Sequence, residues 1–456
     1  MQELLRSTSL RFVWVLLLGL GLAGRAAAQP AAQAAPPPAG APLTLPECVR
    51  YALQNRPLVH QAQLDAQVNE ADIRIGLAGW LPQAGLNANV QRAFQLPFVV
   101  LPNAEGGVAP RQIGLRNTSN INLSGTQAIY NQDVWLARRQ ARPSRQYARQ
   151  NIALVRTNVA ADVSRTFYDV LLSQQQVRVY EADLLRLARG LKDARARYEA
   201  GVADKIDYKQ AEIALNTSRA ARKQAQESAK ASTAQLKELM GLPGAQPLAL
   251  RYDSARLELD AALDTTTGLN PNNRLEIQLL QTQKTLQAAQ IGYYRWGFLP
   301  AVGAYGNYNT VFQDDNFGDL YSRRFPNSFG GVQLTLPILQ GGRRLQNLRR
   351  ARLLDQRLDE DVTATRNTIN TEFEQALASY KGFYADYQYG KQNLALAREV
   401  FRVVDLQYRE GIKPYLDVIV AQSTLRSAEL TYNVALFQVL MSKVEVLRAR
   451  GELAVE

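Results

Sequence analysis

The 456-residue sequence contains one cysteine and one histidine, Cys48 and His60. A single cysteine cannot form a disulfide within the chain, so the fold is stabilised by other means. Two such residues also supply neither a metal cluster nor a pair of nucleophile and base. We therefore expect no catalytic residues, no metal site and no cofactor, and a protein that is not an enzyme.

The surroundings of Cys48 allow two interpretations. A lipid-anchored cysteine normally follows small residues, whereas Leu45, Pro46 and Glu47 precede this one. Free cysteines are also among the most buried residue types in proteins. We interpret Cys48 as a small buried residue on a helix, and modification by a lipid stays open as the alternative.

Beyond its first residues the sequence has no apolar run of roughly 20 residues, the length that a membrane-spanning helix needs. The apolar run Phe12–Leu22 follows Arg6 and Arg11 and precedes three consecutive alanines. This order predicts a signal peptide over residues 1–28, which takes the mature chain across the inner membrane. Residues 29–42, rich in alanine and proline, predict a flexible linker.

The formal net charge of the sequence is +12. A basic surface can bind nucleic acid, but an exported protein rarely meets any. We therefore expect no nucleic-acid partner. Anionic lipid of the outer membrane and acidic partner surfaces suit the charge better.

The two halves of the sequence repeat each other at a spacing of roughly 210 to 218 residues. Three blocks match in the same order: Asn55-Arg56 with Asn273-Arg274; Ile73, Gly79, Leu81 and Pro82 with Ile291, Gly297, Leu299 and Pro300; and Tyr198, Gly201, Asp207, Ala211 and Leu215 with Tyr408, Gly411, Asp417, Ala421 and Leu425. We predict a first structural repeat over residues 43–268 and a second over residues 269–456.

Each repeat begins with a predicted helix, near residues 57–80 and 275–298, that a proline stops. Alternation of apolar and uncharged polar residues then predicts strands, two in each repeat, with clear examples at 84–91, 120–124 and 332–338. Such alternation suits the wall of a transmembrane β-barrel, with lipid outside and water inside. A half-buried soluble sheet alternates in the same way, so this alternative stays open.

The loops between these strands, residues 97–117 and 313–327, are rich in glycine, proline, asparagine and aspartate. This composition is typical of exposed loops.

The longest predicted elements are helices. Residues 144–242 and 338–413 contain no proline and are dense in strong helix formers. A helix of about 70 residues extends roughly 100 Å. Gly201 and Gly411 are predicted to end these helices, and return helices of about 37 residues follow, roughly half as long. The first helix of each repeat has the length to complete the short arm, which predicts a hairpin with one continuous and one broken arm.

Four strands per chain are too few to close a barrel, and open sheet edges are not tolerated in lipid. A barrel must therefore be shared between chains, and three chains would supply twelve strands. The predicted fold class is mainly α with a small β part. Duplicated long helical hairpins form an α-barrel, and four strands per chain contribute to the shared transmembrane β-barrel.

Arginines recur just after the second strand of each half, at positions 138, 139, 142 and 145 and at 343, 344, 349, 350 and 352. The duplicated placement suggests a duplicated location near inner-leaflet head groups. A solvated helix face is the simpler alternative.

The sequence resembles the TolC-like outer-membrane efflux proteins, also called outer membrane factors. The resemblance is carried by residues 45–57 (LPECVRYALQNRP), by Pro337–Gly342 (PILQGG), by the duplicated Leu-Pro strand entries, and by the repeated turn. It implies a homotrimer that forms the exit duct of an efflux or type I secretion system, in the cell outer membrane with a long periplasmic portion. It also implies docking of a periplasmic adaptor (membrane fusion) protein, which links the duct to an inner-membrane pump.

The resemblance assigns roles to the helical turns. Gly201-Val202 and Gly411-Ile412 match the tip on which adaptors dock. Tyr408 and Lys413 match residues that bond an acidic residue of the neighbouring turn, here Asp207, and hold the periplasmic entrance shut.

The sequence departs from the family's entrance pattern at Lys413 and Val420. Lys413 stands where many family members have arginine, so bidentate bonding is lost. Asp417 matches an inward acidic ring, and three chains would crowd six carboxylates around one opening, which attracts cations. Val420 stands where some members carry a second acidic ring. The alternative for Asp207 and Asp417 is that they cap their helices.

An exported soluble coiled-coil protein, structural or adhesive, is the alternative function. It explains the long helices and the signal peptide. It does not explain two alternating strands at the same place in both halves.

Overall fold

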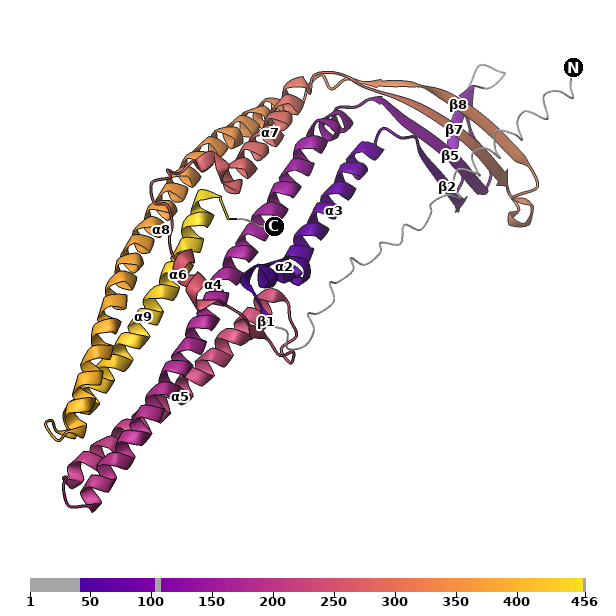
Figure 1. Cartoon of the computed structure of the whole chain (residues 1–456). Coiled ribbons are helices and arrows are strands. Elements are labelled where there is room, and N and C mark those ends of the chain that lie inside the picture. The colour runs from indigo at the N-terminus through magenta and orange to yellow at the C-terminus, as the bar shows by residue number, and fades with distance from the viewer. Residues whose placement is uncertain (1–41, 103–107, 454–456) are drawn as a thin grey trace, which may run out of the picture.

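The computed structural model describes residues 42–102 and 108–453. The predicted signal peptide and nearly all of the predicted linker lie outside the described residues. The described chain has a long helical part with a small β-sheet at one end (Figure 1). No helix in residues 42–102 and 108–453 is long and apolar enough to cross a membrane.

The predicted long hairpins are confirmed. The outward helices are α4 (Gln132–Glu199), with 68 residues, and α8 (Arg343–Arg409), with 67 residues. Each returns through a helix of 36 residues, α5 (Lys205–Met240) or α9 (Tyr415–Arg450). The helix α4 begins before the proline-free stretch and contains Pro143. One backbone hydrogen bond is lost there, while α3 and α7 both pack along α4.

The broken arms are also as predicted. The helices α3 (Pro57–Ala78) and α7 (Leu275–Trp296) have 22 residues each. Both α3 and α5 pack on α4, and both α7 and α9 pack on α8. The end of α5 touches the start of α3. A Cβ added to Gly241 would lie only 2.7 Å from the carbonyl oxygen of Asn55. Gly451 meets Asn273 in the same way at the other joint, at 3.2 Å.

Each joint is closed by the arginine of the duplicated Asn-Arg pair. Arg56 lies 3.7 Å from the carboxylate of Asp162 on α4. Arg274, only 5% exposed, donates to Glu276 at 2.8 Å and to Glu372 at 3.0 Å. It also donates to the carbonyl of Ala449 at the end of α9, at 3.2 Å. An ion pair at the first joint and charged hydrogen bonds at the second therefore connect the broken arm to the long helices.

A middle layer surrounds the joints. It consists of α2 (Leu45–Asn55), α6 (Ser254–Asp260) and a two-stranded parallel pair, β1 (Pro42–Leu43) with β6 (Ala249–Leu250). Together with the long helices it buries the largest apolar cluster, which includes Phe167 and Phe437. Cys48 lies in this cluster with no exposed surface, and burial raises the pKa of its thiol to about 12. The interpretation of Cys48 as a small buried residue is confirmed.

The sheet has four antiparallel strands in the order β2-β5-β7-β8. The strands are β2 (Gln83–Arg92), β5 (Asn117–Tyr130), β7 (Ala301–Asp314) and β8 (Arg324–Thr335). The alternating segments therefore form strands as predicted, although β8 ends before Pro337, whose ring nitrogen carries no hydrogen for the ladder. Within the described chain, β2 and β8 each have one unpaired edge.

The first connecting segment is more than the exposed loop that its composition predicts. It contains an antiparallel hairpin of β3 (Phe98–Pro102) and β4 (Val108–Gln112). The prediction is wrong here because the aromatic and β-branched residues of Phe98–Pro102 favour a strand despite the neighbouring prolines and glycines. The second segment holds a short 3-10 helix, Phe317–Asp319. The backbone N–H of Arg116 donates to Asp315 at 3.0 Å, which joins the two segments.

The joint between α5 and α3 predicts a specific sensitivity at Gly241. Its φ of +72° is unfavourable for other residues, and an added methyl group would strike the backbone of Asn55. Gly241→Ala should destabilise the fold by more than about 1 kcal/mol, which thermal denaturation followed by circular dichroism would detect. Gly244→Ala is the matched control, because nothing lies within 4 Å of the place that its methyl group would take. Equal melting temperatures for the two variants would contradict this role of the joint.

Candidate functional site at the helical tips

The turns between outward and return helices are built alike in both repeats. Gly201 and Gly411 adopt left-handed conformations, with φ of +75° and +77°. The next N–H groups, of Val202 and Ile412, donate to the carbonyls of Arg197 and Gln407 at 3.0 and 2.8 Å. This is the Schellman geometry that ends helices. It leaves the two apolar side chains 74% and 71% exposed, so each turn presents an apolar side chain to solvent.

Behind the turns, the two hairpins are clamped to each other. Tyr408 on α8 is buried, and its ring lies 5.2 Å from that of Tyr415 on α9. The guanidinium of Arg197 on α4 lies 4.5 Å from the centre of the Tyr408 ring and donates to the carbonyl of Arg409 at 3.2 Å. A cation over an aromatic face is attracted electrostatically. The first hairpin is therefore attached to the second hairpin at a point one helical turn above the tip.

Small residues make this clamp possible. Tyr415 is almost fully buried, and its hydroxyl occupies the place that a side chain on Gly190 of α4 would need. Ala194 on α4 and Ala211 on α5 are fully buried in the same cluster. The close approach of α9 to α4 depends on these short side chains.

The acidic gate candidate Asp207 lies in the first turn of α5. Its side chain makes no hydrogen bond or ion pair within the part of the chain that the structure describes. Loss of hydration raises the pKa of its carboxyl group, and the neighbouring carboxylate of Asp204 raises it further. Burial raises the pKa of Tyr408; Arg197 opposes this shift and the Asp207 carboxylate adds to it. Asp207 and Tyr408 therefore lie near each other in one chain, but they are not hydrogen-bonded.

The basic gate candidate Lys413, in the turn before α9, pairs with Asp417 in the first turn of α9, with 3.6 Å between Nζ and Oδ2. The structure thus brings two predicted gate residues together, though not in the pairing with Asp207 that the family resemblance implied. Neither aspartate caps its helix. The α5 cap is Asp204, which accepts from the N–H of Ile206 at 2.9 Å, and Pro414 stands at the cap position of α9. The capping alternative for Asp207 and Asp417 is wrong.

A buried charge network, which the sequence did not reveal, lies further from the turns. Asp183 on α4 has no exposed surface. It accepts hydrogen bonds from Ser218 on α5 at 2.8 Å, and from Gln422 and Arg426 on α9, both at 3.1 Å. Arg186 on α4 lies 3.9 Å from the same carboxylate and 3.1 Å from Glu429 on α9. One carboxylate therefore holds three helices and both hairpins together.

The sequence carries a signal for this network in hindsight. Asp183 falls at helical spacing between buried Val179 and Leu187, on the apolar stripe of α4. A charge on a core-facing stripe is normally paired when it is buried.

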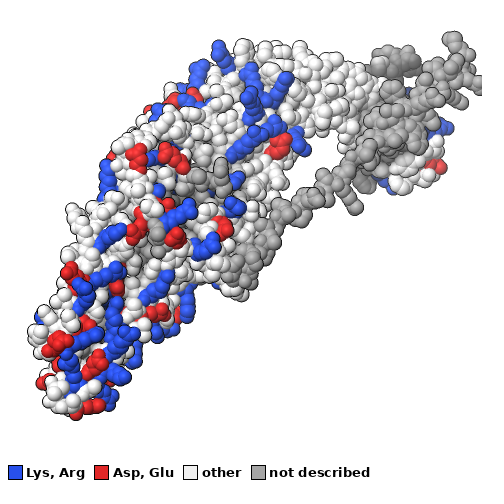
Figure 2. All heavy atoms as spheres, in the orientation of Figure 1, with Lys and Arg blue, Asp and Glu red and all other residues white. Residues whose placement is uncertain are grey.

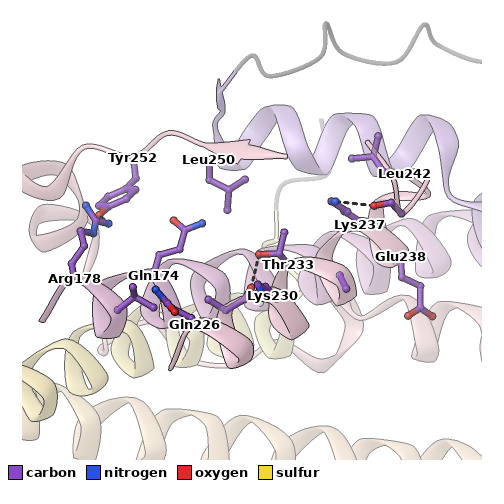
Figure 3. Close-up of a pocket in the computed structure, with 14 residues that line it drawn as sticks. Gln174, Arg178, Gln226, Lys230, Thr233, Lys237, Glu238, Leu242, Leu250 and Tyr252 are labelled. Carbon is purple, nitrogen blue, oxygen red and sulfur yellow. Dashed lines mark hydrogen bonds between the residues drawn. The ribbon is translucent and has the colours of Figure 1, made fainter. Parts of the chain in front are cut away.

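A groove lies elsewhere, between α4, α5 and the segment after α5 (Figure 3). It encloses 1190 Å³. Tyr252 accepts hydrogen bonds there from Arg178 and, at 2.8 Å, from Gln175, while Lys237 donates to the carbonyl of Gly244 at 3.0 Å. These contacts fasten the segment to the hairpin. The lining contains amides, three cations and one carboxylate, Glu238.

Long duplicated helical hairpins joined to a small antiparallel sheet with two free edges define a class of envelope channel protein. Residues 49–242 and 271–452 match the family described as outer membrane efflux protein. The chain belongs to this family. It is an outer-membrane exit duct for efflux or secretion, and the soluble coiled-coil alternative is not favoured.

Individual relatives agree with this assignment over most of their length. The chain is 24% identical to the probable efflux pump outer membrane protein TtgC of Pseudomonas putida over 418 residues, which cover 89% of this chain and 82% of TtgC. It is 23% identical to the outer membrane protein TolC of Vibrio cholerae, covering 90% and 91% of the two chains. The solved structure of the outer membrane protein VceC of Vibrio cholerae shares the fold, with a TM-score of 0.69, 17% identity, and coverage of 89% and 96%.

The buried network makes a prediction about stability. Asp183→Ala leaves Arg426 without its carboxylate in a poorly hydrated site, and breaking a buried pair from one side costs about 3–5 kcal/mol. We expect a markedly lower melting temperature in detergent and faster proteolysis of the separated hairpins. Glu199→Ala, on the same helix, is the control, because its pair with Arg195 is exposed and contributes little. If both variants melt alike, the network does not hold the hairpins together.

Proposed function

We propose that three copies of this chain assemble into one continuous duct. The observation that carries the proposal is the sheet, in which β2 and β8 each leave an edge unpaired within the described chain. Unpaired backbone groups are costly in lipid, and four strands cannot close on themselves. Pairing β8 of one copy with β2 of the next satisfies both edges and closes a twelve-strand barrel.

The helical part would continue this duct into the periplasm. Helices of 68 and 67 residues extend roughly 100 Å from the sheet. Three copies place their hairpins side by side around the same axis. The helices then enclose an α-barrel that opens at the tips.

The exposed turns suit the docking of a periplasmic adaptor. Gly201-Val202 and Gly411-Ile412 form two rigid, similar turns, each with one exposed apolar side chain. Two such turns per chain would give a trimer six similar docking positions. We propose that an adaptor occupies them and connects the duct to an inner-membrane pump.

The residues behind the turns would control the entrance. Asp207, Tyr408, Lys413 and Asp417 lie next to the clamp between the hairpins. In a trimer, three Asp207 and three Asp417 carboxylates would surround the opening, where they attract cations and repel anions. Lys413 partly neutralises Asp417. Exposed Val420 adds no second acidic ring, so we expect modest cation selectivity.

A direct test of the proposed assembly uses the protein purified from outer membranes in mild detergent. We expect a trimeric mass by light scattering and discrete conductance steps in planar lipid bilayers. A monomer that stays in solution after detergent removal and never conducts would exclude the duct.

The gate proposal predicts a change in conductance. In the proposed gate, Tyr408 and Lys413 bond Asp207 of the neighbouring turn, as the family resemblance implies. Asp207→Ala combined with Tyr408→Phe removes these bonds, so the resting entrance should widen and single-channel conductance should rise. The matched control is Glu212→Ala, which removes an exposed carboxylate from the same helix that pairs with Lys209 at 2.9 Å. Unchanged conductance in the double variant would rule out these residues as the gate.

A further inference from the structure

Nine arginines gather where the long helices meet the sheet. They come from the start of α4, the end of α7 and the start of α8, which pack in that order. We call this set the arginine collar: Arg138, Arg139, Arg142, Arg295, Arg343, Arg344, Arg349, Arg350 and Arg352. Figure 2 shows basic side chains crowded at this end of the helices, with few acidic ones among them. Both repeats contribute, so the collar is a duplicated feature.

The collar arginines have no ion-pair partners among residues 42–102 and 108–453. Their neighbours are different: Arg74 and Arg145 both pair with Glu70, at 3.2 and 2.7 Å. The nearby Asp133 carboxylate accepts a hydrogen bond from Tyr293 at 2.7 Å. The Asp133 carboxylate lines the same cavity as Arg343 and Arg344 but forms no ion pair with them. The collar therefore holds nine cations without an ion pair in the described chain.

Helix electrostatics make this arrangement costly without a counter-charge. The first turn of α8 contains no acidic residue and begins with Arg343 and Arg344, at the end where the helix dipole is already positive. Like charges at close spacing repel each other as well. An anionic ligand at this site would remove both penalties.

Aromatic rings hold several of the arginines in place. The Arg138 guanidinium lies 5.7 Å from the Trp80 ring centre and 5.4 Å from that of Trp135. Arg344 lies 4.7 Å from the ring of Phe298. Tryptophan and arginine at one level are characteristic of a membrane–water boundary, where the ring meets the apolar side and the charge meets the polar side.

The chain next to the collar exposes aliphatic side chains. Ile338 and Leu339, in the segment between β8 and α8, are 91% and 89% exposed. A cavity of 520 Å³ opens beside them, lined by Pro337, Arg343 and Arg344 among other residues. Apolar side chains and guanidinium groups are thus adjacent at one level of the molecule.

We propose that the arginine collar binds the phosphate groups of anionic glycerophospholipids in the periplasmic leaflet of the outer membrane. Ile338 and Leu339 insert among the acyl chains. The guanidinium groups bind phosphates at a distance of about one to three helical turns from the sheet. Guanidinium forks match phosphate geometry in two-pronged hydrogen bonds.

A lipid explains the site better than a free anion does. Free phosphate would account for the arginines, but not for the exposed aliphatic residues or the tryptophans beside them. The position of the collar also suits the phosphates of the periplasmic leaflet, because the collar begins where the strands end and extends about 15 Å along the helices. The proposal uses the outer-membrane location of the family and does not depend on the gate or on adaptor docking.

The experiment places the purified full-length protein in nanodiscs with equal amounts of phosphatidylglycerol and phosphatidylcholine. Native mass spectrometry after release then gives the ratio of the two lipids that stay bound. We expect the wild type to be enriched in phosphatidylglycerol. The combined variant Arg349→Gln, Arg350→Gln and Arg352→Gln should lose roughly tenfold of this enrichment.

Two matched variants make the result specific. Arg366→Gln, Arg398→Gln and Arg402→Gln remove three exposed arginines from α8 outside the collar, and this variant should keep the enrichment. Replacing the three collar arginines with lysine keeps the charge, and this variant should keep most of the phosphatidylglycerol enrichment. Equal loss in the variant outside the collar, or no enrichment in the wild type, would overturn the proposal.

Two further measurements separate the alternatives. If the released protein retains inorganic phosphate from a phosphate buffer but shows no excess of phosphatidylglycerol, the site takes free phosphate and the lipid assignment fails. Bilayer conductance of the collar variant should match the wild type. A negative lipid result with normal conductance therefore counts against the collar and leaves the duct standing.

Discussion

The structure depends on a mismatch of lengths. Each outward helix is nearly twice as long as the helix that returns along it, so half of its apolar stripe would face water without another partner. The helices α3 and α7 supply that partner, and the chain must then break the short arm in two. Each break needs a glycine that lets two backbones touch, an arginine that binds the neighbouring helices, and a middle layer that shields the joint. The duplicated Asn-Arg pairs and the glycines at 241 and 451 meet these needs in both repeats.

The same arrangement fixes how the two hairpins of a chain hold together near their free ends. Arg197 over Tyr408 fastens them just behind the turns, and Asp183 fastens them again further along α4. Both contacts join α4 to the second hairpin, whereas the turns themselves stay exposed. A partner that pulls the turns apart must first act against the stacked arginine, which can slide over a ring. The Asp183 carboxylate is harder to displace because it is fully buried and would lose its hydrogen bonds and its arginine partner together.

Most of the fold followed from periodicity and from the positions of proline and glycine. The turns and the broken arms agree with the prediction to within a few residues, and so does the existence of the long helices, because a 3.6-residue period sustained over such lengths has few competing explanations. The start of α4 differs, since it lies 12 residues before the proline-free stretch. Strand β7 was not located individually, since Gly303 and Gly306 interrupt its pattern. The β3–β4 hairpin was missed because local strand preference outweighed a loop-like composition.

The site was less accessible to prediction. The conformations of Gly201 and Gly411 follow from local turn chemistry, so they could be expected. The Lys413–Asp417 pair and the stacking of Arg197 on Tyr408 depend on how two helices rotate against each other, which no local pattern specifies. Asp183 illustrates the same limit. Its place on an apolar stripe marks it as unusual, but its partners lie on two other helices.

The free edges of the sheet belong to different repeats, β2 to the first and β8 to the second. In the proposed trimer, contacts between neighbouring copies would be head-to-tail, and the ring would close when each copy is rotated by one third of a turn from the last. The β5–β7 pairing inside one chain is also a junction between repeats, so it offers a covalently linked example of the contact between copies. In the proposed trimer, duplication would therefore give six near-equivalent wedges. In such a ring, alternate wedges would be free to diverge in sequence, so one set could hold the ring while the other opens it.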